Sequence, residues 1–296
     1  MSKFAGKTAV ISGGAEGIGF SIAQAVGKQG MNVVIGDIDA QQLEQASATL
    51  QEQGVEVLAV SMDVSKQEQW QSVAEQAVAR FGKVHMLVNN AGVSGTPGAI
   101  EQTDDKDWRW VLDVNLMGII YGAEAIVPRI KSHGEGGWVI NVASMAGMVG
   151  VPFAGPYTAT KVAVVGMSES WHAELAPHNI QVSVLCPAFV RTRINLSHRN
   201  KHAEYEQEAG PASQSGTTMS VFEAHLKKVV EAGLAPEIVG ERVIEAISAG
   251  ELYIFTHPNY RKVVQARYKA IDEAFERSAS SPLLQHVLNE DIASFS

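Results

Sequence analysis

The sequence predicts a doubly wound α/β fold, in which helices cover both faces of one parallel β-sheet. Short apolar runs alternate regularly with longer amphipathic segments over most of the chain. Runs such as TAVIS at 8–12 and IQVSVLCP at 180–187 have the apolar character of strands that are buried on both faces. A strand, helix, strand order at this spacing is typical of parallel sheets with helical crossovers.

The predicted elements follow one another closely from the N-terminus to about residue 187. Strands are predicted at 8–12, 31–37, 55–63, 85–92, 138–144 and 180–187, with a further strand at 251–257. Helices are predicted at 17–29, 40–53, 65–82, 104–130, 157–176 and 236–250, with a charged terminal helix at 261–279. Right-handed crossovers place the carboxyl ends of parallel strands along one edge, where ligands of such sheets bind. We therefore expect the functional residues at those ends.

Two segments depart from this alternation. Residues 191–235 are polar, with patches of helical propensity broken by Gly and Pro, which predicts a mobile loop, either a lid or a disordered segment. The last 40 residues contain the charged helix at 261–279. We predict one domain over 1–256, with a helical substrate-loop insertion at 191–235, followed by a C-terminal helical extension at 257–296.

Composition excludes several classes of protein. The formal net charge of −9 leaves no positive surplus for binding nucleic acid, so no nucleic-acid partner is expected. The single cysteine, Cys186, excludes an intrachain disulfide framework, and the N-terminus lacks a signal-peptide core, so we expect a cytoplasmic protein. No apolar run approaches the roughly 18 residues of a membrane-spanning helix, so a soluble protein with no membrane partner is expected, and a peripheral membrane role stays open. His198 and His202 are four residues apart but lack a placed third ligand, so no metal site is expected.

A glycine-rich turn, SGGAEGIG at 12–19, follows the first strand and opens the first helix. Glycines permit backbone turns closed to other residues and let a pyrophosphate approach the N–H groups at the positive end of a helix. The spacing G-x-x-x-G-x-G differs from the general G-x-G-x-x-G fingerprint. The flanking strand and helix nevertheless favour a dinucleotide site of the Rossmann type, with contacts from Gly13, Gly17, Ile18 and Gly19.

Asp37 closes the second strand, 18 residues after Gly19 and near the roughly 20-residue offset of an acid that binds the adenosine ribose. Its carboxylate would repel a 2′-phosphate. No Arg or Lys occurs between Ser12 and Gly19 or directly after Asp37 to offset that repulsion, so the sequence favours NAD over NADP. The alternative is that Asp37 caps a helix.

Two further strand ends carry candidate cofactor contacts. Asp63 ends the third strand, where it could cap a helix or, with Val64 after it, contact the adenine. The fourth strand ends in Asn89 followed by Asn90, Ala91 and Gly92, whose small and hydrogen-bonding groups suit the back of a cofactor site.

Taken together, the motifs resemble those of the short-chain dehydrogenase/reductase family. They occur in the family's order and spacing: SGGAEGIG at 12–19, NNAG at 89–92, Asn115 within DVNLMG, Ser144 after the fifth strand, YTATK at 157–161 and PAFVRT at 187–192. The likeness covers about residues 4–195 and, more weakly, 236–256. Ser12 stands where the family more often has Thr, and Ala188 where Gly is commoner.

The resemblance implies an active site of Asn115, Ser144, Tyr157 and Lys161. Tyr157 would exchange a proton with the substrate oxygen, Ser144 would hydrogen-bond that oxygen, Lys161 would also hold the nicotinamide ribose, and Asn115 would order a water in the proton path. The residues themselves suit this work. Tyr157 and Lys161 are i and i+4 neighbours on a predicted helix, so we expect the ammonium to lower the pKa of the phenol.

The resemblance implies further cofactor contacts from residues of the catalytic helix and the sixth strand end: Tyr157, Lys161, Pro187, Val190 and Thr192. For Thr192, the alternative is a helix cap. It also implies a homodimer or homotetramer. The loops at 93–96, at 145–153 and from Phe189 onward would line the substrate site. The small and apolar composition of SMAGMVGVPFAG favours a hydrophobic or aromatic secondary alcohol or ketone. The C-terminal extension resembles that of members that oxidise bulky alcohols, including Cα-dehydrogenases of lignin-derived aryl ethers.

Three functions remain open at this stage. The first is an NAD-dependent secondary-alcohol dehydrogenase or ketone reductase. The second is a 3-oxoacyl thioester reductase, against which Asp37 argues because biosynthetic reductases usually take NADPH. The third is a catalytically silent dinucleotide-binding regulator, against which the complete set of four active-site residues argues.

Overall fold

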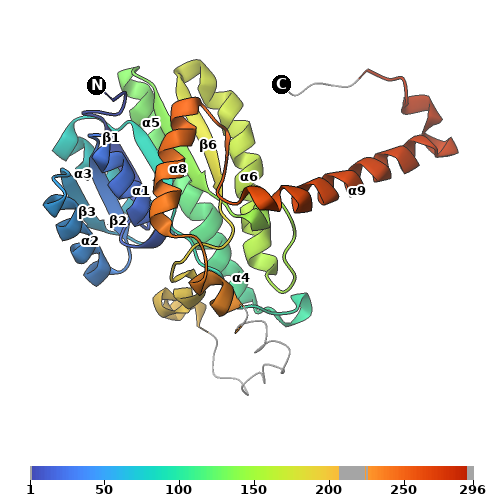
Figure 1. Cartoon of the computed structure of the whole chain (residues 1–296), viewed down its shortest axis with the longest axis horizontal. Coiled ribbons are helices and arrows are strands. Elements are labelled where there is room, and N and C mark those ends of the chain that lie inside the picture. The colour runs from blue at the N-terminus through green and yellow to red at the C-terminus, as the bar shows by residue number, and fades with distance from the viewer. Residues whose placement is uncertain (1, 207–223, 225, 292–296) are drawn as a thin grey trace. The chain divides into compact units, whose positions relative to one another are not determined.

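The computed structural model describes residues 2–206, 224 and 226–291, and its centre is one seven-stranded parallel sheet (Figure 1). The strand order is β3-β2-β1-β4-β5-β6-β7. The strands are β1 (Thr8–Ser12), β2 (Asn32–Asp37), β3 (Val57–Ser61), β4 (Met86–Asn89), β5 (Gly137–Val142), β6 (Ile180–Cys186) and β7 (Tyr253–Phe255). The chain runs outward from β1 to β3 and then returns to build β4 to β7 on the other side of β1. The doubly wound parallel sheet predicted from the sequence is confirmed.

Helices connect the strands and cover both faces of the sheet. They are α1 (Gly17–Lys28), α2 (Ala40–Glu52), α3 (Gln67–Phe81), α4 (Asp105–Leu112), α5 (Gly118–His133), α6 (Gly155–Leu175), α8 (Pro236–Ala249) and α9 (Arg261–Ala279). In Figure 1, α1 and α8 lie side by side in front of the sheet. Each strand leads into its crossover at the same edge of the sheet, and that edge positions the candidate site.

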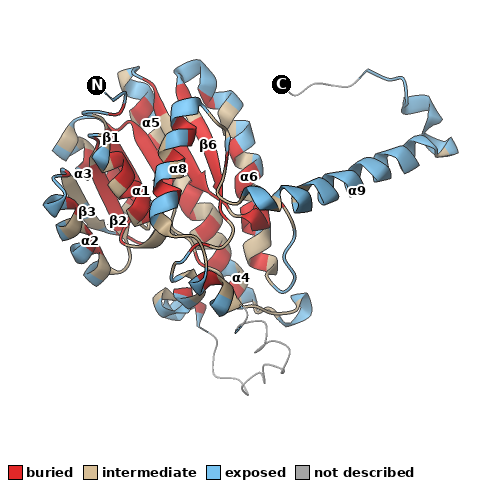
Figure 2. Ribbon diagram, viewed as in Figure 1, coloured by how far each residue is buried: buried red, intermediate tan, exposed pale blue. Residues whose placement is uncertain are grey.

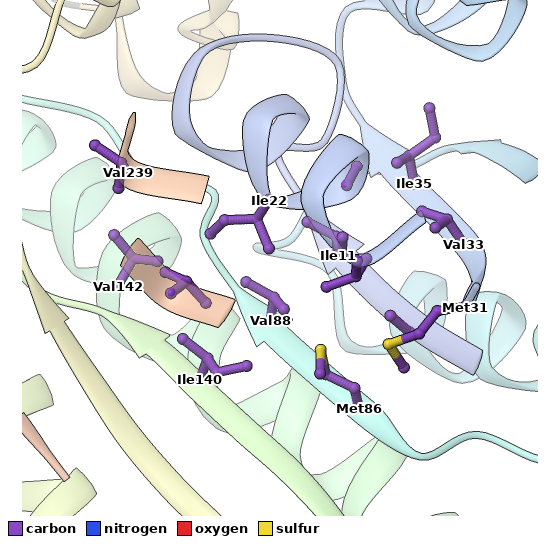
Figure 3. Close-up of a cluster of buried hydrophobic side chains, with 14 of the residues drawn as sticks. Ile11, Ile22, Met31, Val33, Ile35, Met86, Val88, Ile140, Val142 and Val239 are labelled. Atoms are coloured by element: carbon purple, nitrogen blue, oxygen red, sulfur yellow. The ribbon is translucent and has the colours of Figure 1, made fainter. Parts of the chain in front are cut away.

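Two apolar cores, one on each face, hold the helices to the sheet. Ile11 and Ile22 belong to the core beneath α1, α2 and α8 (Figure 3), whereas Val10, next to Ile11 on β1, belongs to the core beneath α3 and α5. Trp70 of α3 and Ile126 of α5 fill that second core. Figure 2 shows the sheet as the most continuously buried part of the main unit. Full burial of one such aliphatic side chain contributes about 1.5–3 kcal/mol, so the strands must be apolar at consecutive positions.

The long helix expected at 104–130 is interrupted. A π-helical turn, Asp113–Met117, separates α4 from α5 and contains the buried Asn115. The combined run Asp105–His133 is long and apolar enough to match a membrane span. No such run was expected from the sequence. Half of the apolar window of this run is buried inside the fold, and it supplies core residues such as Ile126, so it is a core helix of the sheet.

The chain divides into two compact units, Met1–Thr256 and His257–Ser296. Of the loop expected at 191–235, residues 194–200 and 203–205 form short 3₁₀ turns, whereas 207–223 lie outside the described residues. The second unit contains α9 and a 3₁₀ turn at Pro282–Val287. No residue of α9 is buried (Figure 2).

Candidate active site

The predicted site residues gather where the strands end. The glycine turn follows β1, Asp37 is the last residue of β2, and Asn90 directly follows β4. Ser144 follows β5, and Pro187 follows β6. All five strands are parallel neighbours in one sheet, so these residues share its carboxyl edge.

The glycine turn is shaped by close contacts that only glycine permits. Gly13 and Gly17 have positive φ angles of 61° and 56°. A Cβ atom on Gly19 would overlap the carbonyl oxygen of Gly13. Glu16, the N-cap of α1, makes no side-chain hydrogen bond to the first turn of that helix. The turn therefore forms a cradle beside the positive end of α1, which fits a pyrophosphate.

Asn90 braces this turn from β4. Its side-chain nitrogen donates hydrogen bonds to the carbonyl oxygens of Ser12 and Gly13, at 3.0 and 2.9 Å. The Ser12 hydroxyl in turn accepts hydrogen bonds from the backbone N–H groups of Asn90 and Ala91, at 3.0 and 3.2 Å. Asn90 thus fixes the shape of the turn through its side chain, a role that the sequence did not indicate.

The Asp37 carboxylate lies beside the glycine turn. It accepts hydrogen bonds from the backbone N–H groups of Ala15 and Asp39, both at 3.1 Å. Burial raises the pKa of Asp37, and these two hydrogen bonds oppose that rise, while the nearby Glu16 charge adds to it. The helix cap of α2 is Asp39, which accepts from Gln42, so Asp37 is not that cap.

Two arginines from the segment after β6 reach the glycine turn. Arg193 and Arg199 both pair with the carboxylate of Glu16. Because Glu16 is close enough to raise the pKa of Asp37, two cations stand near the candidate ribose site. The expectation of NAD depends on the lack of cations between residues 12 and 19 and directly after Asp37. Arg193 and Arg199 are more than 170 positions from Glu16 in the sequence, so their proximity to the glycine turn could not be expected from it.

Asp63 and Val64 lie at the end of β3 beneath the same segment. Asp63 Oδ1 accepts hydrogen bonds from the backbone and hydroxyl of Ser65, at 2.9 and 2.8 Å. Asp63 Oδ2 is buried and has no hydrogen-bond partner, and His202 Nε2 stands 3.4 Å from it. Val64 is buried against the core, and its carbonyl accepts from Trp70 at 3.2 Å. Asp63 Oδ2 therefore faces His202, whereas the side chain of Val64 serves packing.

Ser144, Tyr157 and Lys161 come together between β5 and α6. Tyr157 and Ser144 are joined by a side-chain hydrogen bond. Lys161 Nζ lies 5.5 Å from the centre of the Tyr157 ring and donates to the carbonyl oxygen of Val142 at 2.8 Å. Ser144 Oγ also accepts from the N–H of Ala146 at 3.1 Å, which fixes its direction. A phenol, a hydroxyl and an amine thus lie close together at one site.

The pKa of Tyr157 is shifted in the direction opposite to the one expected from the sequence. Burial raises the pKa of Tyr157, and the hydrogen bond with Ser144 opposes the rise. Burial also lowers the pKa of Lys161 to about 8, which the nearby Cys186 opposes. The prediction that Lys161 lowers the phenol's pKa is therefore wrong for the chain by itself. Lys161 is held by a backbone carbonyl, and loss of solvation outweighs its charge.

Asn115 lies in the π turn and contacts α6 one turn after Tyr157. Its Oδ1 accepts from the backbone N–H of Val93 at 2.8 Å, and its Nδ2 donates to the Val93 carbonyl at 2.9 Å. Nδ2 also lies 3.4 Å from Thr160 Oγ1, which donates to the carbonyl of Tyr157 at 2.8 Å. Asn115 therefore ties the loop after β4 to α6. Thr160 is a positioning residue that the sequence motif contains but does not identify.

The segment after β6 closes the candidate site. The Pro187 carbonyl accepts from the N–H of Met145 at 2.9 Å, and Val190 is buried in the core. The Thr192 side chain packs so close to Gly17 that a Cβ on that glycine would lie 3.1 Å from it. Thr192 therefore stands over the glycine turn. The thiol of Cys186 is buried, and this burial raises its pKa to about 12.

The loop at 93–96 contacts the segment from Phe189 onward, and Gly98, just after that loop, contacts the loop at 145–153. The N–H of Gly98 donates to the Phe153 carbonyl at 2.9 Å, and the N–H of Ser94 donates to Ser197 Oγ at 3.1 Å. Large apolar side chains remain exposed on these loops and the turn between them: Ile100, Val151, Phe153 and Leu196. These loops therefore expose apolar side chains near the candidate site.

His85, His133 and Glu135 lie within metal-binding distance of one another at the opposite edge of the sheet. The Nδ1 atoms of both histidines accept from backbone N–H groups, those of Thr8 and Glu135. Their Nε2 atoms contact Glu135 and the Val84 carbonyl, at 3.1 and 2.8 Å. The four ring nitrogens are thus engaged, and the cluster links β4 to the end of α5.

Comparison with known proteins agrees with this geometry. The family model described as short chain dehydrogenase matches residues 7–203. The "CLA biosynthesis dehydrogenase/reductase" of Lactiplantibacillus plantarum is 33% identical over 92% of this chain and 95% of its own length. The "C alpha-dehydrogenase" of Sphingobium sp. is 31% identical over 95% of this chain and 90% of its own. A crystal structure of a short chain dehydrogenase/reductase from Burkholderia phymatum in complex with NAD has 34% identity and a TM-score of 0.87, and covers 100% of both chains. The chain therefore belongs to the short-chain dehydrogenase/reductase family and is an oxidoreductase.

Proposed function

We propose that this chain transfers a hydride between NAD(H) and a secondary alcohol or ketone with a hydrophobic or aromatic body. The observation that carries the proposal is the Ser144–Tyr157 hydrogen bond, with Lys161 beside the ring, at the sheet edge that holds the glycine turn. A proton donor and a second hydroxyl are thereby aimed at one place, as reduction of a carbonyl requires.

NAD fits the residues at this edge. The backbone N–H groups at the start of α1 and the cradle of Gly13, Gly17 and Gly19 would hold the pyrophosphate. Asp37 would bind the adenosine ribose and repel a 2′-phosphate. The Asp63 carboxylate would accept a hydrogen bond from the amino group of the adenine. The relative from Burkholderia phymatum, solved with NAD, has the same fold along its whole length.

When bound, the nicotinamide supplies the hydride acceptor or donor. The protein's part is to place the substrate oxygen and to move its proton. The Tyr157 hydroxyl would give its proton to the substrate oxygen during reduction and take it back during oxidation. Ser144 would donate a hydrogen bond to that oxygen. Lys161, whose amine is fixed by Val142, would hold the nicotinamide ribose.

Asn115 would act as a positioning residue in this scheme. Its hydrogen bonds to Val93 and its contact with Thr160 fix the loop after β4 against α6. The ordered water that the family resemblance implies at Asn115 would then continue the proton path toward Lys161 and solvent. The apolar loop residues Ile100, Val151 and Phe153 support an apolar substrate.

A panel assay tests the proposal. The protein is mixed with NAD or NADP and with aryl, aliphatic and steroid secondary alcohols, and absorbance of the reduced nicotinamide is followed. We expect turnover with NAD and an apolar alcohol. Turnover only with NADPH and 3-oxoacyl thioesters would indicate a thioester reductase, and dinucleotide binding without turnover of any alcohol or ketone would indicate a regulator. We also propose that the protein is cytoplasmic and forms a homodimer or homotetramer. Analytical ultracentrifugation measures the mass of the assembly and so tests its subunit number.

A further inference from the structure

Helix α9 carries an apolar stripe that the described residues of its own unit, 257–291, do not cover. Val264, Tyr268, Ile271 and Phe275 recur at intervals of four, three and four residues. With about 3.6 residues in each turn, they form one stripe along the helix. Tyr268 is 55% exposed and Phe275 is 72% exposed. Most helical stability in proteins comes from packing an apolar face, so this stripe requires a cover from outside α9.

The charges of α9 are divided along its length. Basic residues occupy the first half: Arg261, Lys262, Arg267 and Lys269. Acidic residues occupy the second half, Asp272, Glu273 and Glu276, and only Arg277 follows them within the helix. The helix macrodipole favours the reverse order, with acids near the start and bases near the end. The first turn of α9 contains no acid. A neighbour with the opposite order of charge would compensate both halves.

A second copy of α9 in antiparallel orientation has that opposite order. We propose that α9 is a self-association surface, at which two copies of the chain pair their α9 helices antiparallel about a two-fold axis between Tyr268 and Ile271. The 4-3-4 spacing is that of helices packing side by side. Val264 then faces Phe275 of the second copy, and Tyr268 faces Ile271 of the second copy.

The antiparallel orientation follows from the charges. It places the basic half of each helix along the acidic half of the other. A parallel pair would set like charges side by side at both ends, which is unfavourable. A two-fold contact between identical surfaces closes on itself, so it builds a dimer rather than a filament. This inference does not depend on the proposed reaction.

Cysteine cross-linking tests the pairing and its orientation. Residues 264 and 275 are 11 positions apart, about 16 Å along a helix, too far for a disulfide within one helix. Val264→Cys and Phe275→Cys are prepared as separate full-length variants, mixed and mildly oxidised. We expect a disulfide-linked dimer in the mixture and none from either variant alone. The native Cys186 is buried and does not compete.

A second variant tests whether the apolar stripe of α9 packs against a second copy or against another partner. Phe275→Glu should weaken self-association at α9 on the order of tenfold, as loss of an apolar contact of the stripe does. Ala270→Ser, on the other side of the helix, should leave association unchanged. Turnover should be unchanged in both variants.

Three results would overturn the proposal. Val264→Cys linking to itself would mean parallel pairing. An absence of linked dimer in the mixture would exclude pairing in this register. A lower melting temperature of Phe275→Glu, with its association unchanged, would mean that the stripe packs on the main unit.

Discussion

Lys161 Nζ lies 5.5 Å from the centre of the Tyr157 ring, yet its hydrogen bond goes to the Val142 carbonyl. The ammonium is therefore positioned by the sheet rather than by the phenol. Burial raises the pKa of Tyr157 in this setting. The chain by itself holds Tyr157 as a proton donor, which is the form that carbonyl reduction needs.

The pH dependence of alcohol oxidation and of carbonyl reduction follows from the protonated state of Tyr157. Alcohol oxidation needs deprotonated Tyr157, whose population rises about tenfold per pH unit below its pKa. We expect kcat for oxidation to rise between pH 7 and 9. Reduction uses the protonated phenol and should change little between pH 6 and 8. Steady-state rates at saturating cofactor and substrate measure both profiles, and an oxidation rate that is flat from pH 7 to 9 contradicts the role of Tyr157.

Replacing Lys161 should raise the stability of the fold at neutral pH although it abolishes activity. Its pKa falls from 10.5 to about 8 on folding. The folded chain therefore binds fewer protons than the unfolded chain between those values, so this group makes stability rise with pH from about 8 to 10.5. Below pH 8, burying the charged amine costs about 3 kcal/mol, partly offset by its hydrogen bond to Val142.

Lys161→Met should accordingly raise the melting temperature at pH 7, with a smaller difference at pH 10, while activity is lost. Lys131→Met, at an exposed site on α5, is the control and should show neither effect. Thermal unfolding at the two pH values measures the difference. A variant less stable than the parent at pH 7 would mean that the buried charge is compensated within the fold.

Two glycine substitutions test the cofactor cradle. Gly19→Ala places a Cβ against the Gly13 carbonyl and should abolish dinucleotide binding and lower stability. Gly166→Ala adds the same methyl group within α6, where nothing lies within 4 Å, and should stabilise the chain by about 0.5–1 kcal/mol. Calorimetric titration with NAD and thermal unfolding measure both. Unaltered NAD affinity in Gly19→Ala would place the dinucleotide elsewhere.

The acids near the ribose site should set the choice of dinucleotide. Asp37→Ala removes the charge that repels a 2′-phosphate, so the ratio of NADP to NAD affinity should rise about tenfold or more. Glu16→Gln leaves Arg193 and Arg199 without their carboxylate partner, so NADP affinity should rise here also. Glu56→Gln is a control for loss of an exposed acid that pairs with Arg80. If neither Asp37→Ala nor Glu16→Gln changes the ratio, another group reads the ribose.

The sequence predicted the sheet and the positions of the site residues because each depends on local pattern. Apolar runs identify strands such as β1, and a parallel sheet then places Asp37 and Ser144 at one edge. The pairing of Arg193 and Arg199 with Glu16 could not be predicted, since it depends on how the segment after β6 folds back over the glycine turn.

The pKa of Tyr157 was mispredicted for a related reason. Helical spacing places Lys161 near the ring, but it gives neither the depth of burial nor the competing carbonyl of Val142. The π turn around Asn115 was missed because its residues also suit an ordinary helix. For Tyr157 the deciding contact, between Lys161 and Val142, joins two different elements of the fold.

Tyr157→Phe is the most direct measurement of the central claim, that this hydroxyl exchanges the substrate's proton. The variant keeps the ring and removes only the proton-transfer group. With the substrate found in the panel assay, we predict a kcat lower by about 10²–10⁴-fold and an NADH affinity close to that of the parent, whereas Tyr121→Phe keeps full activity. A Tyr157→Phe enzyme that retains most of its turnover would contradict the account.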